Sequence, residues 1–259
     1  MAETTTFKVP ASGDRVRASE RTEVNYATGL SLLGLTSGLA PVDSLLGGLK
    51  GGTVALLTGS RIRLEAAESY CVRAQLPAAR GGLDGSAYFI DAGNSFDVYL
   101  FTALARKHHL NYDSALSAQL LSRAFTVYEL RSLIEGSEAV LARKPKPKLL
   151  IISEVFSLFT EDVDDYEAKR VFRSIASSVS DVSKRQGVPI LLTSETRPDL
   201  IAPILEERCT VSADILQGEG WIKSTLHKHP WKPPGETVTE TALRGYNQNT
   251  LQTEMRPLG

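Results

Sequence analysis

Short runs of consecutive apolar residues alternate with longer amphipathic stretches through the middle of the chain. Uninterrupted apolar runs are typical of strands buried on both faces of a sheet, and they occur at 54–58, 87–90, 149–152 and 190–193. A weaker run at 120–124 predicts a further short strand. Apolar residues at helical spacing predict helices at 64–76, 96–110, 127–141 and 165–185, and a short helix at 41–46.

This alternation predicts the fold class. Near-continuous apolar strands joined by helices are typical of an α/β domain with a mainly parallel sheet and helices on both faces. Ligands of such sheets bind where the strands end, so the residues after Thr58, Ile90, Ile152 and Leu192 are the first places to search for chemistry. Near the C-terminus, the pattern predicts short antiparallel edge strands at 213–216, 221–222 and 225–226, followed by a loop at 227–237, because its prolines cannot donate to a sheet ladder.

Composition narrows the class of protein. The 259 residues are 42% hydrophobic and 23% charged with a formal net charge of -1, which argues against a coat protein that binds nucleic acid by overall charge. Cys71 and Cys209 form no CxxC pair, which argues against zinc and redox motifs and favours a reducing compartment. No segment is typical of a signal peptide or a membrane span. We expect an intracellular protein with a flexible tail at 1–25, one core domain at 26–245 and a C-terminal tail at 246–259.

The ordered segments resemble the RecA-like core of archaeal RadA, RadB and their eukaryotic relatives. The segments that carry the resemblance are GLTSGLAPVDSLLGG, VALLTGS, AYFIDAGNSF, LSRAFTVYEL, KPKLLIISEVFSLF, GVPILLTSETRPD and ADILQGEGWIKSTLHKHPWKPPGE. Together they cover about residues 28 to 240 at family-like spacing. The resemblance implies a RecA-like fold and a role in homologous recombination and DNA repair, in the nucleoid of an archaeon or the nucleus of a eukaryote.

The phosphate loop departs from the family pattern. A working loop, GxxxxGK[ST], places backbone amides and a lysine on the nucleotide phosphates and a hydroxyl on Mg²⁺. Here Thr58, Gly59, Ser60, Arg61 and Arg63 follow the first strand, with no GK[ST] after Gly59. Arg61 or Arg63 could still meet a phosphate, although solvated surface arginines are the ordinary explanation.

Two carboxylates of the family are also missing. By resemblance, the catalytic glutamate position is Gly93; nearby Asp91 is best explained as a helix cap or turn residue. The Walker B aspartate position is Ser153, and the adjacent Glu154 is expected to point to the opposite face of the sheet. The alternative is an alignment displaced by one residue, in which Glu154 takes the aspartate position. Because phosphate loop, water-orienting carboxylate and metal carboxylate all depart, we predict a pseudo-ATPase with no catalytic residues, no metal site and no cofactor.

A cap-like segment remains as a candidate contact. In RadA-like filaments, a proline-containing cap touches the nucleotide of the neighbouring subunit. By resemblance, Lys228, His229, Pro230, Trp231 and Lys232 form such a cap, which this chain could lend to a partner's ATP. The alternative is a surface loop with Trp231 packed on the edge of the domain.

Direct DNA contact has weak support. The segment after the strand predicted at 149–152 is acidic at 161–165 and would repel phosphate, although the family has a DNA-binding loop there. Lys144, Lys146 and Lys148 form the densest basic spot and could contact nucleic acid, although a solvated turn is the ordinary explanation. His108-His109 lacks the spacing of a metal pair. The segment 7–11 only loosely matches the family's aromatic-x-x-alanine interaction arm.

Three functions are consistent with these observations. The favoured one is a non-catalytic accessory subunit that binds a RadA-type recombinase or another RecA-fold paralogue, with DNA bound directly or through that partner. The second is an Elongator-like RecA-fold subunit of a tRNA-modification complex. The third is a divergent ATPase of the RecA family.

Overall fold

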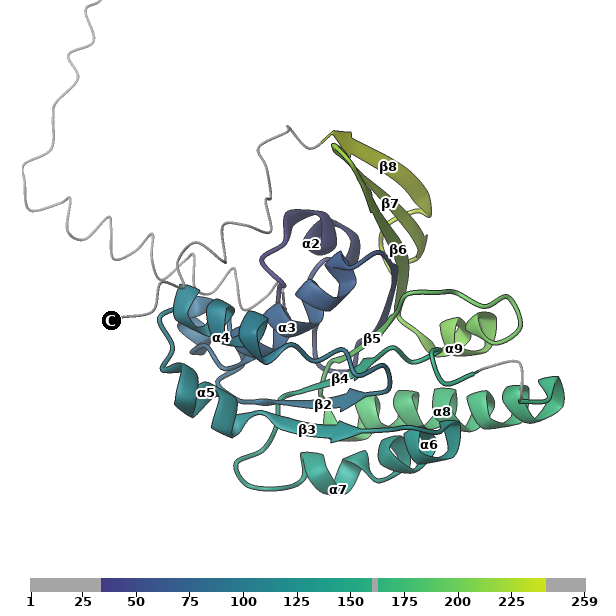
Figure 1. Cartoon of the computed structure of the whole chain (residues 1–259), viewed down its shortest axis with the longest axis horizontal. Coiled ribbons are helices and arrows are strands. Elements are labelled where there is room, and N and C mark those ends of the chain that lie inside the picture. The colour runs from purple at the N-terminus through teal and green to yellow at the C-terminus, as the bar shows by residue number, and fades with distance from the viewer. Residues whose placement is uncertain (1–33, 160–162, 241–259) are drawn as a thin grey trace, which may run out of the picture.

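The four uninterrupted apolar runs all form buried strands of one eight-stranded sheet, in a computed structural model that describes residues 34–159 and 163–240 (Figure 1). The strand order is β3-β2-β4-β5-β1-β6-β7-β8. The strands are β1 Val54–Gly59, β2 Ala87–Asp91, β3 Leu120–Arg123, β4 Leu149–Ser153, β5 Ile190–Ser194, β6 Val211–Gly218, β7 Trp221–Lys228 and β8 Gly235–Glu240. Strands β1 to β6 pair in parallel, whereas β7 and β8 extend the sheet antiparallel.

Helices cover both faces of the parallel part of the sheet (Figure 1). They are α2 Ala40–Leu46, α3 Ile62–Ala74, α4 Val98–Lys107, α5 Tyr112–Ala118, α6 Val127–Glu135, α7 Ser137–Leu141, α8 Asp165–Gln186 and α9 Ala202–Arg208, with a 3-10 turn at Ala78–Arg80. The RecA-like α/β architecture expected from the sequence is therefore confirmed, including the antiparallel strands at the C-terminal edge.

The two faces bury separate hydrophobic cores. In β4, Leu149 and Ile151 pack with α3 and α4, whereas Leu150 and Ile152 pack with α6 and α8. Successive strand residues point to opposite faces, so a strand between two helix layers must be apolar at every position. This is why these strands show no alternation of polar and apolar residues in the sequence.

Three element predictions were wrong in detail. The two short strands expected at 221–222 and 225–226 are one strand, β7. The single helix expected at 127–141 is two helices, α6 and α7, separated at Gly136. The loop expected at 227–237 is shorter, because His227 and Lys228 end β7 and Gly235 already begins β8. The prolines that motivated the loop all lie between the two strands, where no ladder hydrogen bond is needed.

The direction of the strands divides candidate residues between two ends of the sheet. We call the end after β1, β4 and β5 the carboxyl edge and the opposite end the amino edge.

The tails expected at 1–25 and 246–259 and the segment 7–11 lie outside the described residues. None of the helices within 34–159 and 163–240 combines the length and apolar character needed to cross a membrane.

Candidate functional site

The turn between β1 and α3, where a phosphate loop would lie, is short and attached to β6. Only Ser60 and Arg61 separate the two elements. The backbone N–H of Ser60 donates to the Ile215 carbonyl over 2.8 Å, and its hydroxyl donates to the same oxygen over 3.1 Å. Gly59 has φ +114°, and a Cβ there would lie 2.9 Å from the Ile215 carbonyl carbon, so glycine is required.

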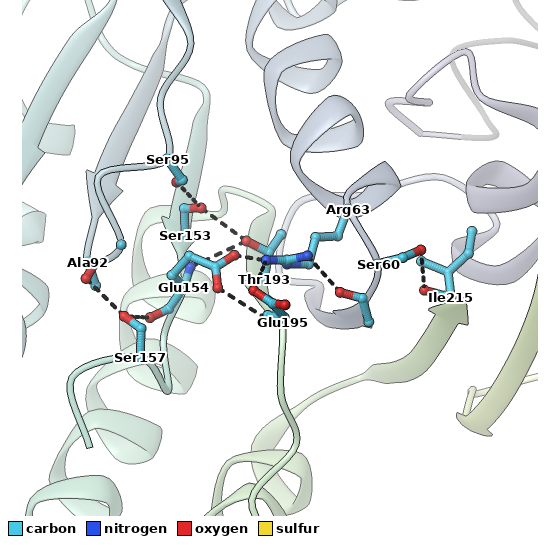
Figure 2. Close-up of polar contacts among 12 residues, drawn as sticks. Ser60, Arg63, Ala92, Ser95, Ser153, Glu154, Ser157, Thr193, Glu195 and Ile215 are labelled. Atoms are coloured by element: carbon cyan, nitrogen blue, oxygen red, sulfur yellow. Dashed lines mark hydrogen bonds and ion pairs between the residues drawn. The ribbon is translucent and has the colours of Figure 1, made fainter. Parts of the chain in front are cut away.

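Arg63 is a buried cation at the start of α3. Its exposed fraction is 4%. Its Nε donates to Glu154 Oε1 over 2.9 Å, and its Nη1 donates to the Gly59 carbonyl over 2.6 Å. Figure 2 shows Arg63 reaching from α3 toward the ends of β4 and β5. The expectation of a solvated arginine is therefore wrong for Arg63, because the strand ends converge on it, whereas Arg61 is exposed as expected.

Glu154 completes this ion pair from the end of β4. It is 6% exposed, and its Oε2 accepts a hydrogen bond from the Glu195 backbone N–H at 3.1 Å. The alternation rule does not apply to it, because β4 ends at Ser153 and Glu154 has φ +58°. The left-handed backbone turns its side chain toward Arg63, which corrects the prediction that Glu154 points to the opposite face of the sheet from Ser153.

Gly93 is sterically matched to Glu154. A Cβ at Gly93 would lie 2.6 Å from the Glu154 Cβ and closer still to its Cγ. The position that the resemblance assigned to the catalytic glutamate therefore faces the side chain of Glu154. A side chain at residue 93 and the observed conformation of Glu154 exclude each other.

Hydroxyl groups occupy the remaining strand ends. Ser153 Oγ lies 2.7 Å from Ser95 Oγ and 3.2 Å from Thr193 Oγ1 (Figure 2). Asp91 accepts hydrogen bonds from the backbone N–H groups of Ser95 and Phe96, so its interpretation as a turn residue is confirmed. Within residues 34–159 and 163–240, no three His, Cys, Asp or Glu side chains are arranged to hold a metal ion.

A buried carboxyl lies further along α3. Glu68 is 2% exposed, its Oε1 accepts from the Asp97 backbone N–H at 2.7 Å, and its Oε2 has no hydrogen-bond partner. Burial, reinforced by the charges of Asp97 and Asp91, raises the pKa of Glu68 to about 8. This carboxyl is therefore largely protonated at neutral pH.

A second polar cluster joins the loop after β5 to β6, β7 and α9. Thr58 Oγ1 donates to Asp214 Oδ1, and Asp214 Oδ2 lies 2.7 Å from His227 Nε2. Arg197 Nη1 lies 3.2 Å from the same His227 nitrogen, and Arg197 Nη2 donates to Glu206 Oε2 over 2.8 Å. Sequence reasoning missed this cluster, because Thr58 and Asp214 are 156 positions apart and no motif links them.

The cap-like segment lies at the amino edge, because β7 runs back from the carboxyl edge. His229 Nδ1 accepts hydrogen bonds from the backbone N–H groups of Trp231 and Lys232, both over 3.1 Å. Lys228 Nζ donates to the Glu206 and Glu207 carbonyls at the end of α9, and Lys232 Nζ donates to the Ser44 carbonyl in α2. Burial, with the charge of Lys232, lowers the pKa of His229.

The Trp231 side chain is more exposed than the surface-loop alternative predicted. It is 74% exposed, so the expectation that it packs on the domain edge is wrong. Its ring centroid lies 5.8 Å from Lys50 Nζ and 5.5 Å from the His229 ring. Pro230 is also exposed. The cap therefore presents an aromatic ring, while its two lysines are held against helix ends.

Lys144, Lys146 and Lys148 lie at the amino edge directly before β4, at the opposite end of the sheet from Arg63 and Glu154. All three are exposed. The phosphate-loop region and the Walker B region thus come together in space, whereas the basic turn and the cap do not join them. His108 and His109 lie at the end of α4.

The described site can be compared with known proteins. The family model for Rad51 matches residues 29–198, which is well over half of the chain. This chain belongs to the Rad51 family. The Rad51 match includes β1 to β5 and both halves of the Arg63–Glu154 pair.

Individual Rad51-family relatives are distant. The chain is 25% identical to meiotic recombination protein DMC1 homolog A of Oryza sativa subsp. japonica, over 83% of this chain and 68% of the relative. It is 24% identical to a DNA repair protein RAD51 homolog of Solanum lycopersicum, over 66% of this chain and 52% of the relative. It is 26% identical to the human DMC1/LIM15 homolog, over 79% of this chain and 67% of the relative.

Proposed function

We propose that this chain is a non-catalytic Rad51-family subunit that assists a catalytically competent recombinase in homologous recombination and DNA repair. Its relatives are named as meiotic recombination and DNA repair proteins. The observation that carries the non-catalytic part is the buried ion pair between Arg63 and Glu154. It lies where a phosphate-binding loop and a metal-binding strand end would meet.

Nucleotide turnover would have to break this pair. Phosphoryl transfer needs a cation free to neutralise the β- and γ-phosphates and a carboxylate that helps to hold Mg²⁺. Arg63 already donates to Glu154 and to Gly59, and Ser153 supplies only a neutral hydroxyl. Moving Arg63 onto a phosphate would leave Glu154 buried without its partner, at a cost on the order of 3–5 kcal/mol.

The partner we propose is a RadA-type or Rad51-type recombinase, or another RecA-fold paralogue. The cap-like segment is the contact by which this chain would reach a partner's nucleotide. Because Lys228 and Lys232 already bind the ends of α9 and α2, Trp231 is the cap residue free to make that contact. The three relatives above come from eukaryotes, which favours the nucleus among the two locations expected from the sequence.

The test of catalysis is ATP hydrolysis by the full chain, alone, with single-stranded DNA and with a Rad51-type recombinase. We expect no turnover by this chain above background and no change in the Glu154→Gln variant. Turnover that disappears in Glu154→Gln would refute the proposal and support a divergent ATPase. A rise in melting temperature with ATP and Mg²⁺ would support the same alternative, because a ligand that binds the folded state stabilises it.

The test of the partner is affinity purification of the tagged full chain from its own cells. We expect a Rad51-family recombinase or paralogue among the bound proteins. Recovery of tRNA-modification subunits without a recombinase would overturn the proposal in favour of the Elongator-like function. If the Lys228→Ala/Lys232→Ala and Trp231→Ala variants both leave the partner's ATPase unchanged, the shared-cap contact is wrong.

A further inference from the structure

Positive charges from two separate elements gather at the amino edge of the sheet. The turn between α7 and β4 supplies four, and the last turn of α8 supplies two. We call this set the basic edge; its members are Arg143, Lys144, Lys146, Lys148, Lys184 and Arg185. Lys146 Nζ donates to the Gln186 carbonyl over 3.4 Å, which joins the turn to the end of α8.

Contacts with neighbouring elements hold the backbone of the basic edge in place. Pro147 is buried between two exposed lysines, and the Lys148 backbone N–H donates to the Ser86 carbonyl over 2.8 Å. Arg185 Nε pairs with Glu138 Oε1 at 2.7 Å, which fixes α8 against α7. Proline in the turn restricts the backbone, so less backbone entropy is lost when a ligand binds there.

Most of these charges are not neutralised by the protein. Arg185 is paired, whereas the other five cations of the basic edge form no ion pair within the part of the chain that the structure describes. The whole chain has a formal net charge of -1, so this concentration of positive charge is local. Every member is exposed, which keeps the cations accessible to a large polyanion.

We propose that the basic edge binds the phosphate backbone of DNA without sequence preference, at the opposite end of the sheet from the Arg63–Glu154 pair. Exposed lysines and arginines release condensed counterions when they contact phosphates, and this supplies most of the free energy of non-specific binding. The proposal rests on the proposed function only in choosing DNA as the polyanion.

The surroundings also favour a nucleic acid over a membrane surface. A segment that lies on a membrane combines cations with apolar side chains that enter the lipid. The large exposed hydrophobic side chains of the described residues include none from 137–148 or from 180–189. The carboxyl edge is less suitable for DNA, because Asp164 and Asp165 begin α8 there and repel phosphate.

The experiment measures binding of the full chain to a labelled DNA duplex and to its single strand by fluorescence anisotropy, over a range of salt concentrations. The test variant is Lys144→Gln/Lys148→Gln, which leaves the Lys146 contact with α8 in place. The matched control is Lys169→Gln/Arg173→Gln, which removes the same charge from another part of α8. Melting temperatures of both variants should stay at the wild-type value, which shows that they fold.

We expect the test variant to bind DNA roughly five- to tenfold more weakly at moderate salt, and the slope of log K against log salt to fall by about 1 to 2. The control should bind as the wild type does. Three results would overturn the proposal. They are equal losses of DNA affinity in both variants, no measurable DNA binding by the wild type, and stronger binding to anionic vesicles than to DNA. Recombinase binding that persists in the test variant separates this site from the proposed accessory function, because the basic edge can then fail as a DNA site while the accessory function stands.

Discussion

Replacing Arg63 tests whether the ion pair at the carboxyl edge is a structural element of the fold. The Arg63→Met variant keeps the length and the apolar part of the side chain but leaves the Glu154 carboxylate buried, with the Glu195 N–H as its hydrogen-bond donor. Removing one partner of a buried pair costs about 3–5 kcal/mol. For a chain of this size, each kcal/mol lowers the melting temperature by about 2–4 °C, so we expect a fall of roughly 10 °C.

A double-mutant cycle separates the pair from the side chains themselves. Glu154→Gln alone should also destabilise the fold, because it leaves buried Arg63 with only the exposed Glu195 carboxylate, 3.5 Å from its Nη2, as a negative partner. The double variant Arg63→Met/Glu154→Gln should be more stable than the sum of the single changes predicts, by about 2 kcal/mol or more. Arg63→Lys should fall between wild type and Arg63→Met, because one ammonium does not reproduce the planar donors that reach both Glu154 and Gly59.

The assay is urea unfolding followed by circular dichroism, with Arg61→Met as the control. Arg61 is exposed at the same turn, and its replacement should change stability by no more than about 0.5 kcal/mol. If Arg63→Met and Arg61→Met have the same effect, or if the cycle shows no coupling, the pair does not hold the strand ends together. Nucleotide turnover would then not be opposed by the cost of breaking this pair.

Two further predictions concern neighbouring buried groups. Gly93→Ala should cost about 1–3 kcal/mol through its clash with Glu154, and the same change made in a Glu154→Gly parent should cost under about 0.5 kcal/mol; equal costs in urea unfolding would show that the clash is not the cause. Glu68→Gln should stabilise the protein increasingly as pH rises from 5 to 8, because the unfolded chain loses its Glu68 proton near the ordinary pKa of 4.5 while the folded state holds it to about 8. The wild type should therefore lose up to about 1.4 kcal/mol per pH unit across this window relative to the variant, and a pH-independent difference between the two unfolding curves would contradict the assigned pKa.

The main strands and helices of the fold follow from local patterns in the sequence. A strand such as 149–152 is recognisable because a position between two helix layers must be apolar on both faces, which leaves a continuous apolar run. The helix at 165–185 is recognisable by its apolar spacing, and Asp164 caps its start as local chemistry expects. The prediction of a pseudo-ATPase likewise rests on residue types read along the chain, with no GK[ST] after Gly59 and a serine at position 153.

The arrangement of the site depends on contacts between segments that are distant in the sequence. Arg63 and Glu154 are 91 positions apart, and no local pattern distinguishes a buried arginine from a solvated one. The left-handed backbone at Glu154 and the missing side chain at Gly93 matter only because β2 and β4 lie side by side. The amino edge also depends on tertiary packing. The cations of the turn before β4 lie near those at the end of α8 only because the fold brings these two elements together. The sequence alone therefore predicted most of the strands and helices, whereas tertiary packing decided which charges are paired, buried or exposed.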